Sequence, residues 1–234
     1  MHGCPPDEIE AITTYLMKER GIHTSVKCNP TLLGPDRVRG IINDDLGFGD
    51  VPIPDIAFGH DLKWEDAVPM FHNLRRIARA EGVTFGLKLS NTLEVENWRT
   101  VFDRDDMMYL SGRALHPVTT NLALRLSEEF HGDLLLSFAG GADAFNVAEL
   151  LASGMKSVTV CSDLLKSGGY LRMLQYLENT RAAMEEAGAA DLDDFIARRA
   201  LASDGFAEFA PLLNYAALSS TGLDLDVEDA ATLG

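Results

Sequence analysis

Polar residues that could take part in catalysis follow two apolar segments in the first half of the sequence. Lys27 and Asn29 lie at the end of HTSVKCN, and Lys88, Asn91 and Thr92 lie at the end of VTFGLKLSNT. If these segments are strands, an ammonium group there can stabilise negative charge that develops during a reaction, as on an enolate or a reduced flavin. Each lysine alone could instead be a solvated residue on a strand edge. Lys27 is the stronger candidate, because its neighbours are apolar or small.

Glycine and serine residues follow two later apolar segments. Gly140 and Gly141 end DLLLSFAGG, and Ser162 and Asp163 lie within SVTVCSDLL. The backbone N–H groups of a glycine pair can approach an anion closely, and the loops after the last two strands form the phosphate site of many (βα)8 barrels. Any one of these residues could simply begin a turn after its strand. This alternative accounts less well for polar residues or glycines at the ends of all four expected strands. The pattern therefore predicts a phosphate site.

Short apolar segments alternate with amphipathic ones along the chain and predict the elements that position these residues. We expect helices at 5–20, 63–82, 117–132 and 143–154, and strands at 23–29, 83–91, 133–141 and 157–165. Strands that alternate with helices indicate a parallel α/β sheet, in which the carboxyl ends of the strands carry the site. The polar residues of all four strand ends are thus expected at one edge of the sheet.

Two connections are longer than the others. Residues 31–62 are rich in turn formers and predict an insertion without a hydrophobic face, and residues 93–113 predict a second irregular segment. Connections of this length are typically lids, binding loops or mobile segments. Beyond residue 170 the composition shifts towards Ala, Glu and Leu, which predicts two or three helices within 170–219.

Composition excludes several classes of function. The formal net charge of -16 argues against nucleic acid and against an anionic membrane surface as partners. No apolar run approaches the roughly 20 residues of a membrane helix. The three cysteines are scattered and no signal peptide precedes them, which predicts reduced thiols in the cytoplasm. The sequence contains no CxxC or HExxH, so we expect no iron–sulfur cluster or metal site within this chain. It also contains neither the GxSxG of serine hydrolases nor the GxGxxG of dinucleotide-binding folds.

Six segments together carry a family resemblance. They are MHGCPPDEIEAITTYL, VKCNPTLLG, KLSNTL, MMYLSGRALHP, GGADAFN and SDLLKSGGYLR. Over residues 1–175, the order and spacing of these segments resemble the flavin barrel of the selenate reductase subunit family, which is glutamate-synthase-like. That family is related to the FMN domains of dihydropyrimidine dehydrogenase and dihydroorotate dehydrogenase.

The resemblance implies a role for each candidate residue. It places Lys27 against the pyrimidine edge of the flavin, and it implies that Cys4 lies close to the position of a catalytic acid/base cysteine. Cys4 could equally be a small buried residue. The remaining expected contacts are Asn29, Asn91 and Thr92 with substrate, Lys88, Ser111 and Gly112 with the cofactor, and Gly140, Gly141 and Ser162 with the FMN phosphate. VKCNP departs from the Lys-Leu-Thr-Pro segment that is usual there, so the substrate need not be a pyrimidine.

The resemblance also places the start of this chain after the first half of the barrel. The expected fold is the C-terminal half, about four βα units, of an aldolase-type (β/α)8 TIM barrel with a helical C-terminal tail. We expect a partial barrel at 1–175, a helical extension at 176–220 and a flexible acidic tail at 221–234, in a chain truncated by a cut, a split gene or a downstream start codon. A half barrel leaves open sheet edges, which predicts pairing in a homodimer or with a separate first half. A reductase or iron–sulfur partner is a further expectation.

Three functions are compatible with these residues. The first is an FMN-dependent oxidoreductase that moves hydride to or from a small heterocyclic or carbonyl substrate. The second is a phosphate-ligand binding module without redox chemistry, and the third is a truncated subunit with no activity of its own. Bound flavin would separate the first from the other two.

Overall fold

The computed structural model describes residues 4–201, without the side chains of residues 200 and 201. Contacts between residues divide the chain into two compact units, Met1–Leu122 and Ala123–Gly234. The division falls within helix α5 (His116–Glu129), and each unit is described by itself. The tail expected at 221–234 and the end of the helical region expected at 170–219 lie outside the described residues.

The first unit contains a parallel strand pair with a helix before each strand. Its elements are α1 (Pro6–Lys18), β1 (Thr24–Cys28), α4 (Trp64–Glu81) and β2 (Phe85–Leu89). These elements confirm the helices and strands expected at 5–20, 23–29, 63–82 and 83–91. Local chemistry explains two of the boundaries: a proline begins α1, and Gly82 in the left-handed conformation ends α4.

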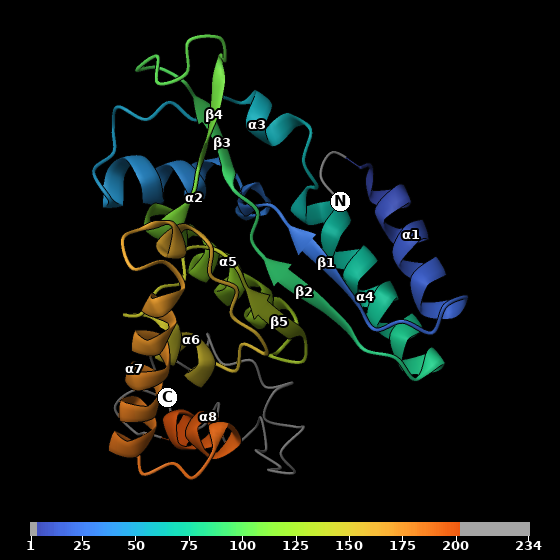
Figure 1. The fold of residues 1–234 in the computed structure, drawn as a ribbon. Coiled ribbons are helices and arrows are strands. Elements are labelled where there is room, and N and C mark those ends of the chain that lie inside the picture. Colours follow the sequence, from blue (N-terminus) through green and yellow to red (C-terminus); the bar gives the residue numbers. More distant parts are fainter. Residues whose placement is uncertain (1–3, 202–234) are drawn as a thin grey trace. The chain divides into compact units, whose positions relative to one another are not determined.

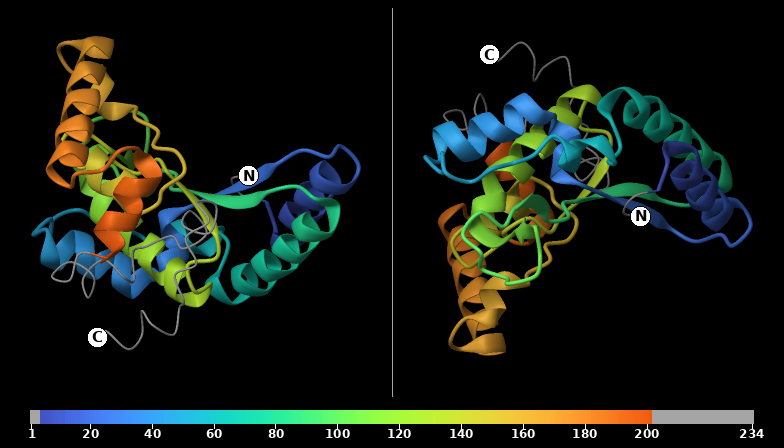
Figure 2. Two further views of the ribbon diagram at one scale, coloured as in Figure 1. Left: turned by 90° about the horizontal axis from the view of Figure 1, so that it is seen from below. Right: turned by 90° about the horizontal axis from the view of Figure 1, so that it is seen from above.

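The two faces of this strand pair differ in character. Val26 and Cys28 of β1 lie on the same face as Leu87 and Leu89 of β2, and all four are buried. Helices α1 and α4 lie side by side over this face, as Figure 1 and Figure 2 show. Because side chains alternate along a strand, Lys27 and Lys88 point to the opposite face.

The segment 31–62 does have a hydrophobic face, so this expectation was wrong. It forms a 3₁₀ helix (Pro30–Leu33), α2 (Pro35–Arg39), a π-helical turn (Gly40–Asp45) and α3 (Ile56–Gly59). Its buried apolar residues are Leu32, Leu33, Val38, Ile41, Ile42, Val51, Ile53, Ala57 and Phe58. They are spread over several short elements, so the sequence shows no single period that would have revealed them.

The segment 93–113 is also more regular than expected. Strands β3 (Leu93–Glu96) and β4 (Met107–Leu110) pair antiparallel, with Leu93 opposite Leu110. Asn97 holds the connection between them, since its side-chain amide donates to the carbonyl oxygens of Phe102 at 2.7 Å and of Asp105 at 2.8 Å. A short 3₁₀ helix (Gly112–Leu115) then leads into α5. The expectation of a wholly irregular segment was therefore wrong.

The second unit contains one strand and several helices. They are β5 (Leu135–Phe138), α6 (Val147–Ala152), 3₁₀ helices at Ser162–Leu165 and Gly169–Arg172, α7 (Met173–Glu186) and α8 (Leu192–Leu201). These confirm the strand expected at 133–141 and the helices expected at 143–154 and beyond residue 170. None of the described helices is both long and apolar enough to cross a membrane.

The strand expected at 157–165 is reduced to one bridge. Phe138 and Val158 form an isolated parallel pair, in which the N–H of Thr159 donates to the carbonyl of Phe138 at 2.8 Å. The chain then turns into the 3₁₀ helix that starts at Ser162. This turn ends the ladder before a full strand can form, so the expected strand was wrong in length.

Candidate functional site

Two asparagines meet where β1 and β2 end. Asn29 follows β1 and Asn91 follows β2, and the side-chain Nδ2 of Asn91 donates to Oδ1 of Asn29 at 2.6 Å. The backbone N–H of Asn91 donates to the carbonyl of Cys28 at 2.9 Å, which continues the pairing of the two strands by one step. The parallel register thus places two amide side chains together at the carboxyl ends of the strands.

A carboxylate from the preceding connection completes this group. Asp61 lies between α3 and α4, and its Oδ1 accepts a hydrogen bond from Nδ2 of Asn29 at 2.5 Å. Its Oδ2 accepts from Oγ1 of the buried Thr31 at 2.6 Å. We call Asn29, Thr31, Asp61 and Asn91 the amide cluster.

Lys27 and Lys88 are direct neighbours on adjacent strands. They are partners in the parallel register of β1 and β2, on the face opposite to α1 and α4. Adjacent strands lie about 4.8 Å apart, so the stems of both side chains start close together. Lys27 is exposed and Lys88 half-buried. Two ammonium groups this close make the face attractive to an anion or to a group that becomes negative during a reaction.

A small cavity adjoins the amide cluster. Cys4, Lys27, Cys28, Asn29 and Asp61 line it together with apolar side chains, and its volume is about 20 Å³. This volume accommodates about one water molecule. Burial raises the pKa of Cys28 to about 12, so this thiol stays neutral at physiological pH. Cys4 is half-buried and therefore the more accessible of the two thiols.

Thr92, Ser111 and Gly112 lie at the base of the β3–β4 hairpin. Leu93 pairs with Leu110, so Thr92 and Ser111 come next in the same antiparallel register. Both residues are exposed, and Gly112 adopts a positive φ of 71°. Thr92 follows Asn91 directly, which joins this group to the amide cluster through the backbone.

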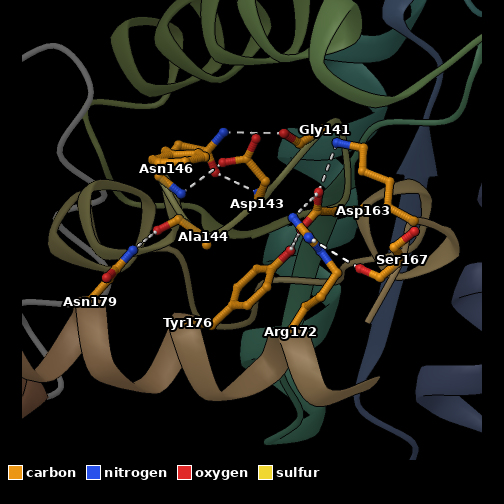
Figure 3. Close-up of polar contacts among 11 residues, drawn as sticks. Gly141, Asp143, Ala144, Asn146, Asp163, Ser167, Arg172, Tyr176 and Asn179 are labelled. Atoms are coloured by element: carbon orange, nitrogen blue, oxygen red, sulfur yellow. Dashed lines mark hydrogen bonds and ion pairs between the residues drawn. The ribbon is translucent and has the colours of Figure 1, made fainter. Parts of the chain in front are cut away.

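In the second unit, the loop after β5 is held by its own side chains (Figure 3). The backbone N–H of Asp143 donates to Oδ1 of Asn146 at 2.8 Å, and Nδ2 of Asn146 donates to the carbonyl of Gly141 at 3.2 Å. Gly141 has a φ of 85°, a conformation that suits glycine. Within residues 4–201, the N–H groups of Gly140 and Gly141 donate no hydrogen bond to another group. The loop thus has a fixed shape with two backbone donors to offer, which fits a phosphate group.

Asp163 is the hydrogen-bonding centre of the following segment. Its carboxylate accepts from Nε and Nη2 of Arg172 at 3.1 and 3.0 Å, from Nζ of Lys166 at 2.9 Å and from Oη of Tyr176 at 2.6 Å. Figure 3 shows Arg172 and Tyr176 directed towards Asp163. Burial raises the pKa of Asp163, but the donated hydrogen bonds outweigh it and hold the pKa well below its usual range. Asp163 therefore fixes the backbone on which the half-buried Ser162 lies.

The structure divides the expected site residues into two groups. Those brought together in the first unit are Cys4, Lys27, Asn29, Lys88, Asn91, Thr92, Ser111 and Gly112. Gly140, Gly141 and Ser162 lie in the second unit. No group of three or more metal-ligating side chains occurs among the described residues.

Sequence reasoning missed the residues that hold these groups in place. Asp61 lies in a connection with no local pattern, and only its contacts with Asn29 and Thr31 reveal it. Asp163 and Arg172 both lie in the segment SDLLKSGGYLR that carried the family resemblance. Asp163 followed by the basic Lys166 and Arg172 in one short segment was the available signal for this second group.

Comparison with known protein families gives one match that covers most of the chain. The family described as oxidoreductase YgfK, N-terminal TIM-barrel domain, matches residues 1–204. This match confirms the expected α/β class with a TIM barrel, and a partial barrel is consistent with it. Two curated relatives are named oxidoreductase YgfK, one from Escherichia coli strain K12 and one from strain O157:H7. Each is 45% identical to this chain over 173 residues. The aligned residues are 74% of this chain and 17% of YgfK, so the chain spans a small part of these relatives.

Solved structures of DHODH from Eimeria tenella are similar to part of the chain. The complex with ferulenol has a TM-score of 0.42 and 16% identity, and the match covers 56% of this chain and 35% of that one. The ligand-free form has a TM-score of 0.40 and 19% identity, and covers 55% and 35% of the two chains.

Proposed function

Because this chain belongs to the family of the N-terminal TIM-barrel domain of oxidoreductase YgfK, we propose that it supplies the FMN site of an oxidoreductase. The proposed reaction moves a hydride between the flavin and a small heterocyclic or carbonyl-bearing substrate. The choice of FMN rests on the resemblance to the selenate reductase subunit family and to the FMN domains of dihydropyrimidine and dihydroorotate dehydrogenases. The observation that carries the proposal is the register of β1 and β2, which pairs Lys27 with Lys88 beside the amide cluster.

The two lysines act by electrostatics in this proposal. FMN, when bound, supplies the hydride chemistry. Lys27 and Lys88 favour the negative charge that develops on the cofactor as it is reduced, because they hold two ammonium groups on one face of the strand pair. In this proposal Lys27 and Lys88 bind the cofactor and stabilise its negative charge, and the register of β1 and β2 places them together.

The residues for the substrate lie at the ends of the same strands. Asn29 and Asn91 offer amide groups, and Thr92 and Ser111 offer hydroxyl groups at the base of the neighbouring hairpin. Cys4 lines the cavity beside Asn29 and is the proposed acid/base that exchanges a proton with the substrate. Cys28 is unsuited to this role because burial keeps its thiol neutral, with a pKa of about 12.

The FMN phosphate is assigned to residues of the second unit. Gly140 and Gly141 offer backbone N–H groups in a loop of fixed shape, and Asp163 anchors the turn that carries Ser162. A side chain larger than hydrogen at Gly141 would meet a strained backbone at its φ of 85°. These features fit the phosphate role that the resemblance implies.

We also propose that further polypeptide covers part of the second unit. Several large apolar side chains in α7 and in the two 3₁₀ helices before it are exposed, namely Leu165, Tyr170, Leu171, Leu174 and Leu177. Exposed large apolar side chains in one short stretch of chain are typical of an interface with other polypeptide when they form a continuous surface. The proposed occupant is a further part of the barrel, supplied by other polypeptide or by a second copy of this chain.

The test of the function is the visible absorption spectrum of the purified chain before and after incubation with FMN and removal of free flavin. Flavin bands that co-elute with the protein would support the proposal. A colourless protein that binds small phosphorylated compounds would instead favour a phosphate-ligand module, and a colourless protein that binds neither would mean that the chain is inactive alone.

A further inference from the structure

The direction of a side-chain amide depends on its hydrogen-bonding partners. The two ends of an asparagine side chain are nearly equal in shape, but the oxygen only accepts hydrogen bonds and the NH₂ group donates them. A neighbour that can only accept therefore determines which end faces it. The amide cluster contains such a neighbour, because an ionised carboxylate has no donor.

Asp61 determines the direction of Asn29. Both carboxylate oxygens of Asp61 face donors, Nδ2 of Asn29 at 2.5 Å and Oγ1 of Thr31 at 2.6 Å. An Asn29 turned the other way would place its oxygen against a carboxylate oxygen, which is repulsive. Asn29 consequently directs its Oδ1 away from Asp61 and towards Asn91.

Asn29 in turn determines the direction of Asn91. Its Oδ1 is an acceptor, so it faces Nδ2 of Asn91, at a distance of 2.6 Å. The backbone of Asn91 is also engaged, through its N–H to the carbonyl of Cys28 and its carbonyl to the hydroxyl of Ser90. Within residues 4–201, no group donates a hydrogen bond to Oδ1 of Asn91. This oxygen is the acceptor that the cluster offers to a ligand.

We propose that Asp61 is a positioning residue that orients Asn29 and Asn91, so that Asn91 presents a hydrogen-bond acceptor and the ligand must supply an N–H or O–H group there. The first part of this proposal, the orientation of the two amides by Asp61, concerns only residues of this chain. The second part rests on the proposed function, in which Asn91 contacts the substrate. It requires a hydrogen-bond donor on the part of the ligand that faces Asn91.

An isosteric substitution separates orientation from folding. In Asp61→Asn, the new amide can accept from or donate to Asn29, so both directions of the Asn29–Asn91 pair become possible. Asp44→Asn is the matched control, because Asp44 lies exposed in the same connection and loses the same charge. Thr31→Val is a second variant, which removes one donor to Asp61 but leaves the contact between Asp61 and Asn29.

The first measurement is the exchange rate of the Asn91 side-chain NH₂ protons with water, by NMR of the ¹⁵N-labelled chain. The Asp61→Asn substitution should accelerate this exchange about fivefold through loss of a fixed partner, whereas Asp44→Asn and Thr31→Val leave it unchanged. Exchange in the wild type that is as fast as in Asp61→Asn would overturn the orientation of the amides, whether or not any ligand binds.

The second measurement is the affinity for succinimide and N-methylsuccinimide, a matched pair of imides with and without one N–H, in the FMN-treated chain. Succinimide should bind about tenfold more tightly to the wild type, and Asp61→Asn should reduce this preference, because a site built to accept a hydrogen bond rejects an analogue without the donor. Equal binding of both imides, or binding of neither, would overturn the ligand half of the proposal while leaving the exchange result to decide the orientation. Failure of the chain to bind FMN is a separate outcome that concerns the proposed function alone.

Discussion

Lys27 lies directly opposite Lys88 in the parallel register of β1 and β2. The two residues are 61 positions apart in the sequence, yet the register makes their side chains neighbours on one face of the strand pair. Like charges on adjacent strands repel each other, and an anion bound beside them would reduce this repulsion. Its presence beside the amide cluster is what favours a site for a group that is, or becomes, negative.

The lysine pair predicts how FMN affinity responds to loss of one charge. Lys27→Met or Lys88→Met should each weaken FMN binding about tenfold, which corresponds to about 1.4 kcal/mol. Lys18→Met is the control, because Lys18 is an exposed residue at the end of α1. The dissociation constants follow from quenching of flavin fluorescence. Equal affinity of all three variants would show that the lysines do not contact the flavin.

The hydrogen bonds of Asp163 are expected to contribute strongly to the free energy of unfolding of the second unit. It is only 4% exposed and accepts hydrogen bonds from Lys166, Arg172 and Tyr176. Asp163→Ala leaves the guanidinium of Arg172 without its carboxylate, and loss of one partner of a buried pair costs about 3 to 5 kcal/mol. Urea denaturation should therefore show a large loss of unfolding free energy. Glu178→Gln, which removes a charge at an exposed position of α7, should change it little.

Because the pKa of Asp163 is lowered in the folded protein, we expect the stability of the protein to depend on pH. The pKa of Asp163 is lower in the folded protein than its unfolded value of about 3.9. The unfolded state therefore binds the proton more readily, and the stabilisation is fully present above about pH 5. It decreases as the pH falls below the unfolded pKa towards the lower folded one. Denaturation midpoints measured between pH 3 and 7 should fall more steeply in the wild type than in Asp163→Ala, and parallel curves would contradict this.

The three cysteines predict an order of chemical reactivity. Cys161 is exposed, Cys4 is half-buried and Cys28 is buried with a pKa of about 12. Thiolates are the reactive form, so iodoacetamide at pH 8 should label Cys161 first, Cys4 more slowly and Cys28 only after unfolding. Peptide mass spectrometry of the time course measures this order. Rapid labelling of Cys28 in the native chain would show that the cavity beside the amide cluster is open.

The apolar residues at the start of α7 predict association of the isolated chain. Leu174 and Leu177 are 57% and 63% exposed, and burying them against another polypeptide is favourable. The purified chain should elute as more than a monomer, and Leu174→Glu with Leu177→Glu should shift it towards one. Gln175→Glu is the control on the same helix, since it adds a charge without removing an apolar side chain. Light scattering gives the mass, and a monodisperse wild-type monomer would count against the proposed interface.

The helices and strands around the site could largely be predicted from the sequence. Alternating apolar segments and glycine stops identified α1, β1, α4, β2 and β5, because these signals act over a few residues. Prediction failed where apolar residues are spread over short turns, as in 31–62, and where two short strands flank a polar connection, as in β3 and β4. In those segments, contacts with distant parts of the chain select the conformation.

The sequence by itself determined which polar residues follow the apolar segments, including Lys27, Asn29, Lys88 and Asn91, and the resemblance that links them to a flavin barrel. The tertiary structure decided that Lys27 is paired with Lys88, and that Asp61 directs Asn29 and, through it, Asn91. The physical reason is that turn and helix signals are local, whereas strand register and the direction of a buried amide depend on partners 30 to 62 residues away.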